Sequence, residues 1–207
     1  VMTLHLASQR MLLPSAQVSS LTTGSITLPS AKKDYYPDAS FDSIATFSIN
    51  STTSTVEFTS IPSTYKHLQI RAFGKTSAAT GNADAFVFNF NSLGNVTTST
   101  GYAHYLSTDG SSSASGYAVQ STTPYLYYII GRNAQFGGCV IDIFNYANTN
   151  MYKTLRAIGG QDANGSGVIA ISSFLWQNTA AISSIKIDPN GNSFLQYSHI
   201  ALYGIKG

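Results

Sequence analysis

The chain has 207 residues, of which 43% are hydrophobic and only 10% are charged, and its formal net charge at pH 7 is +2. The apolar content argues against a globally disordered chain. The weak charge and the scattered basic residues argue against a nucleic-acid-binding protein, which needs clustered Lys and Arg. We therefore expect no nucleic-acid partner, and one packed domain of roughly 150–200 residues preceded by a shorter segment.

Residues 1–40 form a predicted extended N-terminal arm. They show no sustained helical or strand period, and Pro14, Pro29 and Pro37 interrupt any long helix. About 35 residues reach at most roughly 120 Å when extended, which is enough to cross a neighbouring subunit. We expect the arm to lie against a partner; the alternative is an irregular edge strand folded back on its own domain. Its predicted partner-binding residues are the apolar side chains Leu4, Leu6, Met11, Leu12, Leu13, Ile26 and Leu28.

After residue 40 the sequence changes to short apolar strands separated by turn residues. A period of two is plain at Phe86, Phe88 and Phe90, which are expected to share one face of a strand. About eleven short strands at this spacing predict an all-β domain over residues 41–207, an antiparallel β-sandwich of the jelly-roll kind. The predicted strands lie near residues 42–50, 55–61, 67–73, 85–91, 101–106, 125–131, 138–145, 153–159, 167–175, 182–187 and 199–205.

Several connections carry turn chemistry, because Gly and Asn accept positive φ and Pro presets a turn. We predict turns at Asp109–Gly110, at Asn164–Gly165 and at Asp188–Gly191. The Ser-rich stretch Ser111–Gly116 reads as an exposed loop, and Thr179–Ser184 as the one place for a single helical turn.

The titratable residues are few and dispersed, so we predict no catalytic residue, no metal site and no cofactor. Glu57 is the only glutamate, and no two aspartates are close enough in sequence to indicate glycosidase chemistry. Cys139 lies in an apolar run typical of a buried small hydrophobe. The histidines lack metal-ligand spacing, although one His per subunit could hold a metal on a symmetry axis; they are His5, His67, His104 and His199.

Aromatic residues make up 12% of the chain, including 13 tyrosines. We expect Tyr125, Tyr127 and Tyr128 to belong to the core or to a subunit interface, where a tyrosine combines buried area with a polar tip. The alternative is a stacking platform for sugars, to which Tyr102, Tyr105 and Tyr117 would contribute.

Five segments together resemble a β-rich domain of virion proteins from tailed bacteriophages, including cyanophages. The resemblance covers residues 41–207 and rests on the segments Ile61–Ile70, Asn145–Asn150, Trp176–Ile182, Pro189–Phe194 and Ala201–Ile205. Such domains occur in tail-fibre-like proteins and in small proteins that decorate the head. The resemblance implies a structural role in the virion and brings no catalytic residues with it.

We therefore expect a non-enzymatic capsid decoration or cement protein on the outer surface of a phage capsid. The arm would bind the major capsid protein or another virion protein, and the β-domain would form a homo-oligomer, a trimer over a local symmetry axis. No membrane partner is expected, because the apolar stretch Met11–Leu13 ends at Pro14. The main alternative is a receptor-binding module of a tail fibre that binds glycans. A third, a polysaccharide depolymerase, would require a pair of carboxylates in a cleft.

Overall fold

The chain divides into two units, Val1–Ala39 and Ser40–Gly207, in this computed structural model. In the first unit the described part is a pair of two-residue strands, β1 (Leu21–Thr22) and β2 (Ser25–Ile26), which pair antiparallel. The sequence pattern did not predict this pairing. The structure describes the second unit at residues 40–79, 83–92, 101–108, 115–121, 124–132, 135–164 and 166–207.

The second unit consists of strands, and its described residues contain no helix. Every predicted strand is present, and β8 is an additional strand that was not predicted. The strands are β3 (Phe41–Ser48), β4 (Val56–Phe58), β5 (His67–Thr76), β6 (Asp84–Phe90), β7 (Gly101–Thr108), β8 (Ser115–Ser121), β9 (Tyr125–Arg132), β10 (Gly137–Phe144), β11 (Lys153–Asp162), β12 (Gly167–Trp176), β13 (Ile185–Asp188) and β14 (His199–Ile205).

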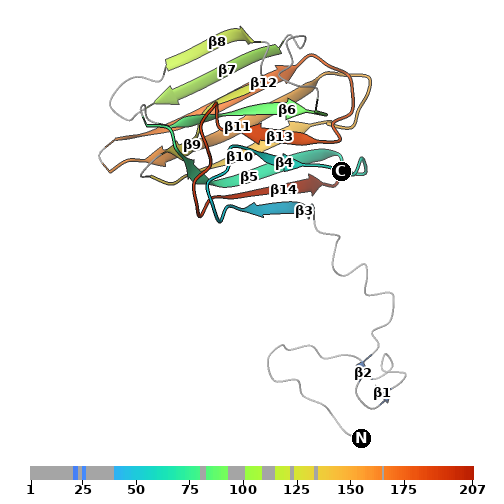
Figure 1. Cartoon of the computed structure of the whole chain (residues 1–207). Coiled ribbons are helices and arrows are strands. Elements are labelled where there is room, and N and C mark those ends of the chain that lie inside the picture. Colours follow the sequence, from blue (N-terminus) through green and yellow to red (C-terminus); the bar gives the residue numbers. More distant parts are fainter. Residues whose placement is uncertain are drawn as a thin grey trace, which may run out of the picture. The chain divides into compact units, whose positions relative to one another are not determined.

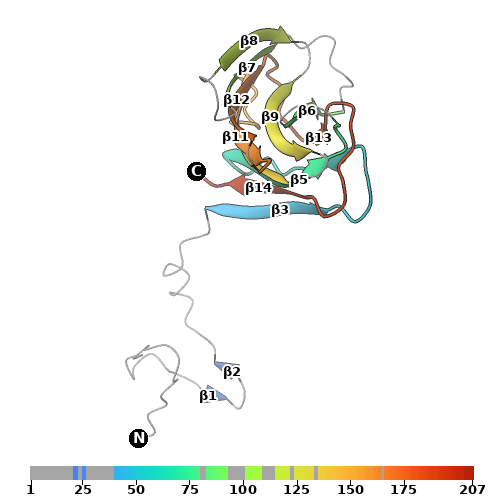
Figure 2. The same cartoon turned by 90° about the vertical axis from the view of Figure 1, so that its left-hand side faces the viewer.

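The strands form two layers. The larger layer has the order β3-β14-β5-β10-β11-β12-β7-β8 with antiparallel pairing throughout (Figure 1). The smaller layer has the order β4-β13-β6-β9, and Figure 2 shows β6, β9 and β13 on one side of the larger layer. A short parallel pairing of Lys75–Thr76 with Gly131–Arg132 joins the layers.

This arrangement confirms the prediction of an all-β, sandwich-like fold. The jelly-roll connectivity is not confirmed, because β10, β11 and β12 follow one another as neighbours in the same layer, which is a meander. A search of the described residues finds no helix long and apolar enough to cross a membrane.

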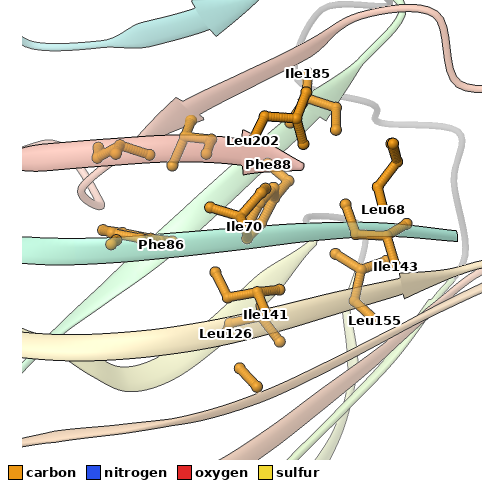
Figure 3. Packing of buried hydrophobic residues seen from close by; sticks show 14 of the residues in the cluster. Leu68, Ile70, Phe86, Phe88, Leu126, Ile141, Ile143, Leu155, Ile185 and Leu202 are labelled. Carbon is orange, nitrogen blue, oxygen red and sulfur yellow. The ribbon is translucent and has the colours of Figure 1, made fainter. Parts of the chain in front are cut away.

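The core lies between the two layers, and Figure 3 shows its packing. On β10 the residues alternate, with Cys139, Ile141 and Ile143 buried. Phe86, Phe88 and Phe90 share one face of β6, as predicted, and that face is buried. Burial of each such side chain contributes roughly 1.5–3 kcal/mol, so the alternation selects this register over one shifted by a residue, which would turn these side chains to the other face.

Strand β9 crosses the inner face of the larger layer at very short range. A Cβ atom on Gly131 would lie 2.3 Å from the amide nitrogen of Gly137, and one on Gly137 would lie 2.5 Å from that of Gly131. The two glycines therefore allow the backbones to approach, which side chains would prevent. The amide of Tyr127 and that of Arg132 donate to side chains of the larger layer, to Ser172 Oγ at 3.0 Å and Gln161 Oε1 at 3.0 Å.

Two of the predicted turns can be compared with the structure. In Asp188–Gly191, Asn190 and Gly191 have φ of 53° and 78°, and the Gly191 amide donates to Asp188 Oδ1. Asn164 has φ of 54°. The turn at Asp109–Gly110 lies outside the described residues.

Two local predictions were wrong. The Ser-rich loop ends earlier than expected, because β8 begins at Ser115 and pairs with β7; residues 111–114 lie outside the described residues. Thr179–Ser184 forms no helical turn. Instead Asn91 holds this segment through its side chain, donating to Ala181 O at 2.7 Å and accepting from the Ser183 amide at 2.7 Å. These bonds satisfy backbone groups that a helical turn would have paired internally.

Candidate interaction surfaces

The residues predicted to bind a partner through the arm mostly lie outside the described residues. The exception is Ile26, which belongs to β2 and pairs with Leu21 of β1. The others are Leu4, Leu6, Met11, Leu12, Leu13 and Leu28.

The described histidines lie apart and have ordinary structural neighbours. His67 Nδ1 accepts a hydrogen bond from the Asn145 amide at 3.0 Å, and burial lowers the pKa of His67. His199 Nδ1 lies 3.1 Å from Ser48 Oγ, and His104 is exposed on β7. No group of three or more His, Cys, Asp or Glu suited to a metal occurs in the described part of the chain, and His5 lies outside it.

Cys139 and Glu57 have the environments that the sequence predicted. Cys139 is buried, and this burial raises the pKa of its thiol to about 12, so the reactive thiolate is suppressed at neutral pH. Glu57 is exposed on β4.

Asp84 is a buried carboxylate that joins three parts of the sandwich. It accepts hydrogen bonds from Thr76 Oγ1 at 2.7 Å, from the Ala85 amide at 2.8 Å and from Asn192 Nδ2 at 3.0 Å. Burial raises the pKa of Asp84, and these bonds and the charge of Arg132 oppose the increase. The donors that it binds are neutral structural groups from β5, β6 and the turn before Phe194. This arrangement fits a structural link better than an acid–base pair.

The predicted tyrosines form one cluster where β9 lies against β7. The ring centroids of Tyr105 and Tyr127 are 4.9 Å apart, those of Tyr105 and Tyr128 are 5.2 Å apart, and those of Tyr125 and Tyr127 are 5.4 Å apart. All four side chains are half-buried. The Tyr125 hydroxyl donates to Asn190 Oδ1 at 2.9 Å. Tyr102 and Tyr117 lie on β7 and β8, outside the residues whose side chains the structure describes. We name Tyr105, Tyr125, Tyr127 and Tyr128 the tyrosine cluster.

A break in the alternation of β9 creates this cluster. Strict alternation would place Tyr128 on the same face as Leu126, which is fully buried. Tyr128 instead has φ of +57°, and the pairing of β9 with β6 is irregular between its contacts with Asp84 and Phe86. A bulge of this kind redirects a side chain, and it brings the adjacent Tyr127 and Tyr128 to the same neighbour, Tyr105. Positive φ costs a bulky residue about 1–3 kcal/mol.

The outer face of the larger layer carries a second surface, which the sequence analysis did not identify. Val140, Ile158, Ile171 and Leu106 are direct neighbours across β10, β11, β12 and β7. Ile158, Ile171 and Leu106 are 56%, 49% and 48% exposed, and Ile169, on the same face of β12, is 65% exposed. We name Leu106, Val140, Ile158, Ile169 and Ile171 the outer apolar patch. In the run Val168–Ile171 the residues on both faces of the strand are apolar. This sequence pattern could have indicated the outer apolar patch.

A polar row borders the outer apolar patch. Arg156 and Asp142 form an ion pair at 2.9 Å, and Gln69 Nε2 donates to Asp142 Oδ1 at 2.9 Å. Ser173 and His104 continue this row across β12 and β7. Arg71 stands directly opposite Val140 on β5, and its guanidinium lies 4.7 Å from the ring centroid of Tyr203 and 5.0 Å from that of Phe41. The border therefore also carries a positive charge.

No family model, curated protein or solved structure matches the chain, so comparison with known proteins assigns no function to these surfaces.

Proposed function

We propose that this protein is a non-enzymatic structural protein of a phage particle, a decoration or cement protein that its arm attaches to the outer surface of the capsid. The observation that carries the proposal is the self-sufficiency of the second unit. The hydrophobic core of the described residues extends from Ile49 to Leu202 and lies wholly within Ser40–Gly207. In this proposal residues 1–39, with their apolar groups, serve attachment.

The surface chemistry supports attachment through apolar contacts. With 10% charged residues and a net charge of +2, the chain has little to gain from long-range electrostatics. Binding of this kind changes little with salt. Arms that an oligomer holds together bind far more tightly than a single arm, because the second contact is intramolecular. The number of subunits, for which we expect three, stays a prediction, as does the identity of the partner as the major capsid protein or another virion protein.

A truncation tests the proposal. The full chain and a chain lacking residues 1–36 would be incubated with shells of the major capsid protein encoded alongside this chain, and sedimented. We expect the full chain to co-sediment and the truncated chain to stay in the supernatant while retaining its far-ultraviolet circular dichroism. Equal binding by the truncated chain would refute attachment through the arm.

A second variant separates the apolar contacts from the mere length of the arm. Replacing Met11, Leu12 and Leu13 together by Ser keeps the length and removes the largest apolar group. We expect weaker co-sedimentation of this variant, and little change between about 0.1 and 0.5 M salt for the unmodified chain.

One observation favours a second candidate function, a glycan-binding module of a tail fibre. The positive φ of Tyr128 destabilises the folded chain, and strained residues of this kind gather at functional sites. Ligand binding by the tyrosine cluster would explain why the strain is present. Half-buried tyrosines with polar tips can stack on sugar rings while donating hydrogen bonds.

The conformation of Tyr128 supplies a clean test of this alternative. Tyr128→Gly removes the ring at a φ that glycine adopts without strain. On a glycan array, we expect binding by the full chain and loss of binding by this variant, with Tyr152→Ala, at an exposed tyrosine elsewhere, as the control. Absence of binding by the full chain would dismiss the glycan-binding alternative.

A further inference from the structure

The turn after β13 contains one of the two Asn-Gly dipeptides of the chain, Asn190–Gly191. An Asn-Gly dipeptide can react with itself, because the glycine amide nitrogen can attack the side-chain carbonyl carbon of the asparagine and close a five-membered ring. Both residues are exposed, and a Cβ atom on Gly191 would meet no heavy atom within 4 Å beyond its chain neighbours. Water therefore reaches this dipeptide, and no side chain crowds the glycine.

The nucleophile of this reaction, the Gly191 amide, is hydrogen-bonded to a carboxylate. It donates to Asp188 Oδ1 at 3.2 Å. A carboxylate in this position can accept the amide proton as the nitrogen attacks, which is the role of a general base. The Asn192 amide donates to Pro189 O at 3.0 Å and closes the turn, so the carboxylate and the nucleophile are held together.

The electrophile, the side-chain carbonyl group of Asn190, also has a hydrogen-bond donor. The Tyr125 hydroxyl donates to Asn190 Oδ1 at 2.9 Å. Negative charge develops on this oxygen when the carbonyl carbon is attacked, and a donor that is already in place stabilises it, as in an oxyanion hole. Burial and the charge of Asp188 raise the pKa of Tyr125, so the hydroxyl keeps its proton at neutral pH.

The other Asn-Gly dipeptide, Asn164–Gly165, supplies an internal comparison, because it too has an aspartate two residues before the asparagine. There Asp162 Oδ1 accepts from the amide of Asn164 itself, at 2.9 Å. That nitrogen precedes the asparagine side chain and is not the nucleophile of the ring closure. The two sites therefore match in sequence but differ in the amide that the carboxylate binds.

We propose that Asn190 is a site of self-catalysed deamidation, with Asp188 as the base and the Tyr125 hydroxyl as the donor to the carbonyl oxygen. The Gly191 nitrogen forms a bond to Asn190 Cγ and passes its proton to Asp188. The bond from Cγ to Nδ2 then breaks, and the leaving group takes up that proton and departs as ammonia. One water molecule opens the resulting succinimide at either carbonyl, which gives an aspartate or an isoaspartate at position 190.

The product changes the charge beside the tyrosine cluster. A new carboxylate replaces the amide that Tyr125 binds, near the existing charge of Asp188. In the isoaspartate form the backbone of the turn is one atom longer. Asn192, whose Nδ2 donates to Asp84 Oδ2 at 3.0 Å, follows in the same turn. The modification thus acts on the second unit and does not rest on the proposed attachment to a capsid.

Mass spectrometry of tryptic peptides tests the proposal, because trypsin separates the two sites: Asn164 lies in residues 157–186 and Asn190 in residues 187–206. The folded full chain would be incubated at neutral pH and sampled over time. We expect Asn190 to lose its amide at least about threefold faster than Asn164, as one additional hydrogen bond to the developing charge implies. In urea the two rates should be similar, because unfolding removes both sets of contacts.

Two variants test the assigned roles. Tyr125→Phe removes the hydroxyl and should slow the loss of ammonia at Asn190 by about threefold to tenfold. Asp188→Asn keeps an oxygen that can accept from the Gly191 amide but removes the base, and should slow the reaction at least about tenfold. The substituted side chain precedes Pro189, which has no amide proton, so it does not undergo the same ring closure.

Asn164 is the control within every sample and should react at the same rate in all three chains. Far-ultraviolet circular dichroism checks that both variants are folded. The proposal is wrong if Asn190 keeps its amide while Asn164 reacts. It is also wrong if both variants lose ammonia from Asn190 at the rate of the unmodified chain.

Discussion

Lys153 is a fully buried lysine whose ammonium group lies among backbone carbonyl oxygens. Its Nζ donates to Asn148 O, to Met151 O at 2.8 Å and to Thr179 O at 3.0 Å, and lies 3.5 Å from Asn178 O. Burial lowers the pKa of Lys153, but the carbonyl oxygens stabilise its charged form. One side chain thus ties the turn after β10 to the segment after β12.

We predict that Lys153→Met destabilises the second unit by about 2–4 kcal/mol. The methionine fills similar space, but carbonyl groups that the ammonium now satisfies would be left buried without a donor. Urea unfolding measures the change, with Lys186→Met on β13, a partly exposed lysine, as the control. Equal stability of the two variants would show that the hydrogen bonds from Lys153 Nζ to the backbone carbonyl groups contribute nothing to the stability of the second unit.

Asp84 gives a prediction about pH. Burial raises its pKa above the unfolded value of about 3.9, so the folded chain binds the proton more readily than the unfolded chain. Its contribution to stability is therefore greatest below pH 3.9 and falls as the pH rises through the raised pKa. In Asp84→Asn this titration is absent.

We expect the free energy of unfolding of the unmodified chain, relative to that of Asp84→Asn, to decrease from about pH 4 toward neutrality. Urea unfolding at a series of pH values measures this difference. Only the slope is predicted, because the offset between the two chains also depends on the hydrogen bonds of the new amide. Parallel pH profiles would contradict the prediction.

At the scale of elements, the crossing of β9 over β10 and β11 determines how the layers join. Gly137 is at the tightest point, where a Cβ atom would also lie 2.5 Å from Gly160 O. Its neighbour Gly138 faces the other side of the sheet, where the nearest atom to a Cβ is Ala72 O at an ordinary 3.5 Å.

Gly137→Ala should destabilise the second unit by about 2–3 kcal/mol, because overpacking against backbone atoms cannot relax by a rotamer change. Gly138→Ala is the matched control and should change stability by less than about 1 kcal/mol. Thermal and urea unfolding would measure both. If the two alanine variants are equally destabilised, steric crowding at Gly137 does not limit how closely β9 approaches the larger layer.

Strand β8 shows how pairing can override local preference. Its sequence, Ser115–Ser121, begins with a serine and a glycine, and this part of it was predicted to be a loop. The strand forms because each of its residues has a partner on β7, from Ser115 opposite Ser107 to Ser121 opposite Gly101. Strand propensity depends strongly on such context.

At the scale of the whole molecule, the division into two units makes a prediction about stability. The second unit contains the core of the described residues, and it should fold without residues 1–36. We expect the truncated chain to have the midpoint of thermal unfolding of the full chain within about 2 °C when both are at equal concentration, since association shifts this midpoint. A drop of 10 °C or more would mean that the first unit supports the sandwich.

The sequence by itself determined the strands of the second unit other than β8, two turns and part of the core. These features are local: alternation with a period of two predicts a strand wherever it occurs, and Asn190 and Gly191 accept positive φ in any fold. The burial of Cys139 followed from its apolar run. The dispersed titratable residues gave no indication of a catalytic site.

Only the tertiary structure decided which strands are neighbours, and both candidate surfaces depend on that choice. Leu106, Ile158 and Ile171 come from separate parts of the chain, and the register of β7, β11 and β12 places them side by side. Tyr128 reaches Tyr105 because β9 carries a bulge that alternation does not predict. Register arises from contacts distant in sequence, so a local pattern can predict a strand without showing what its outer face will meet.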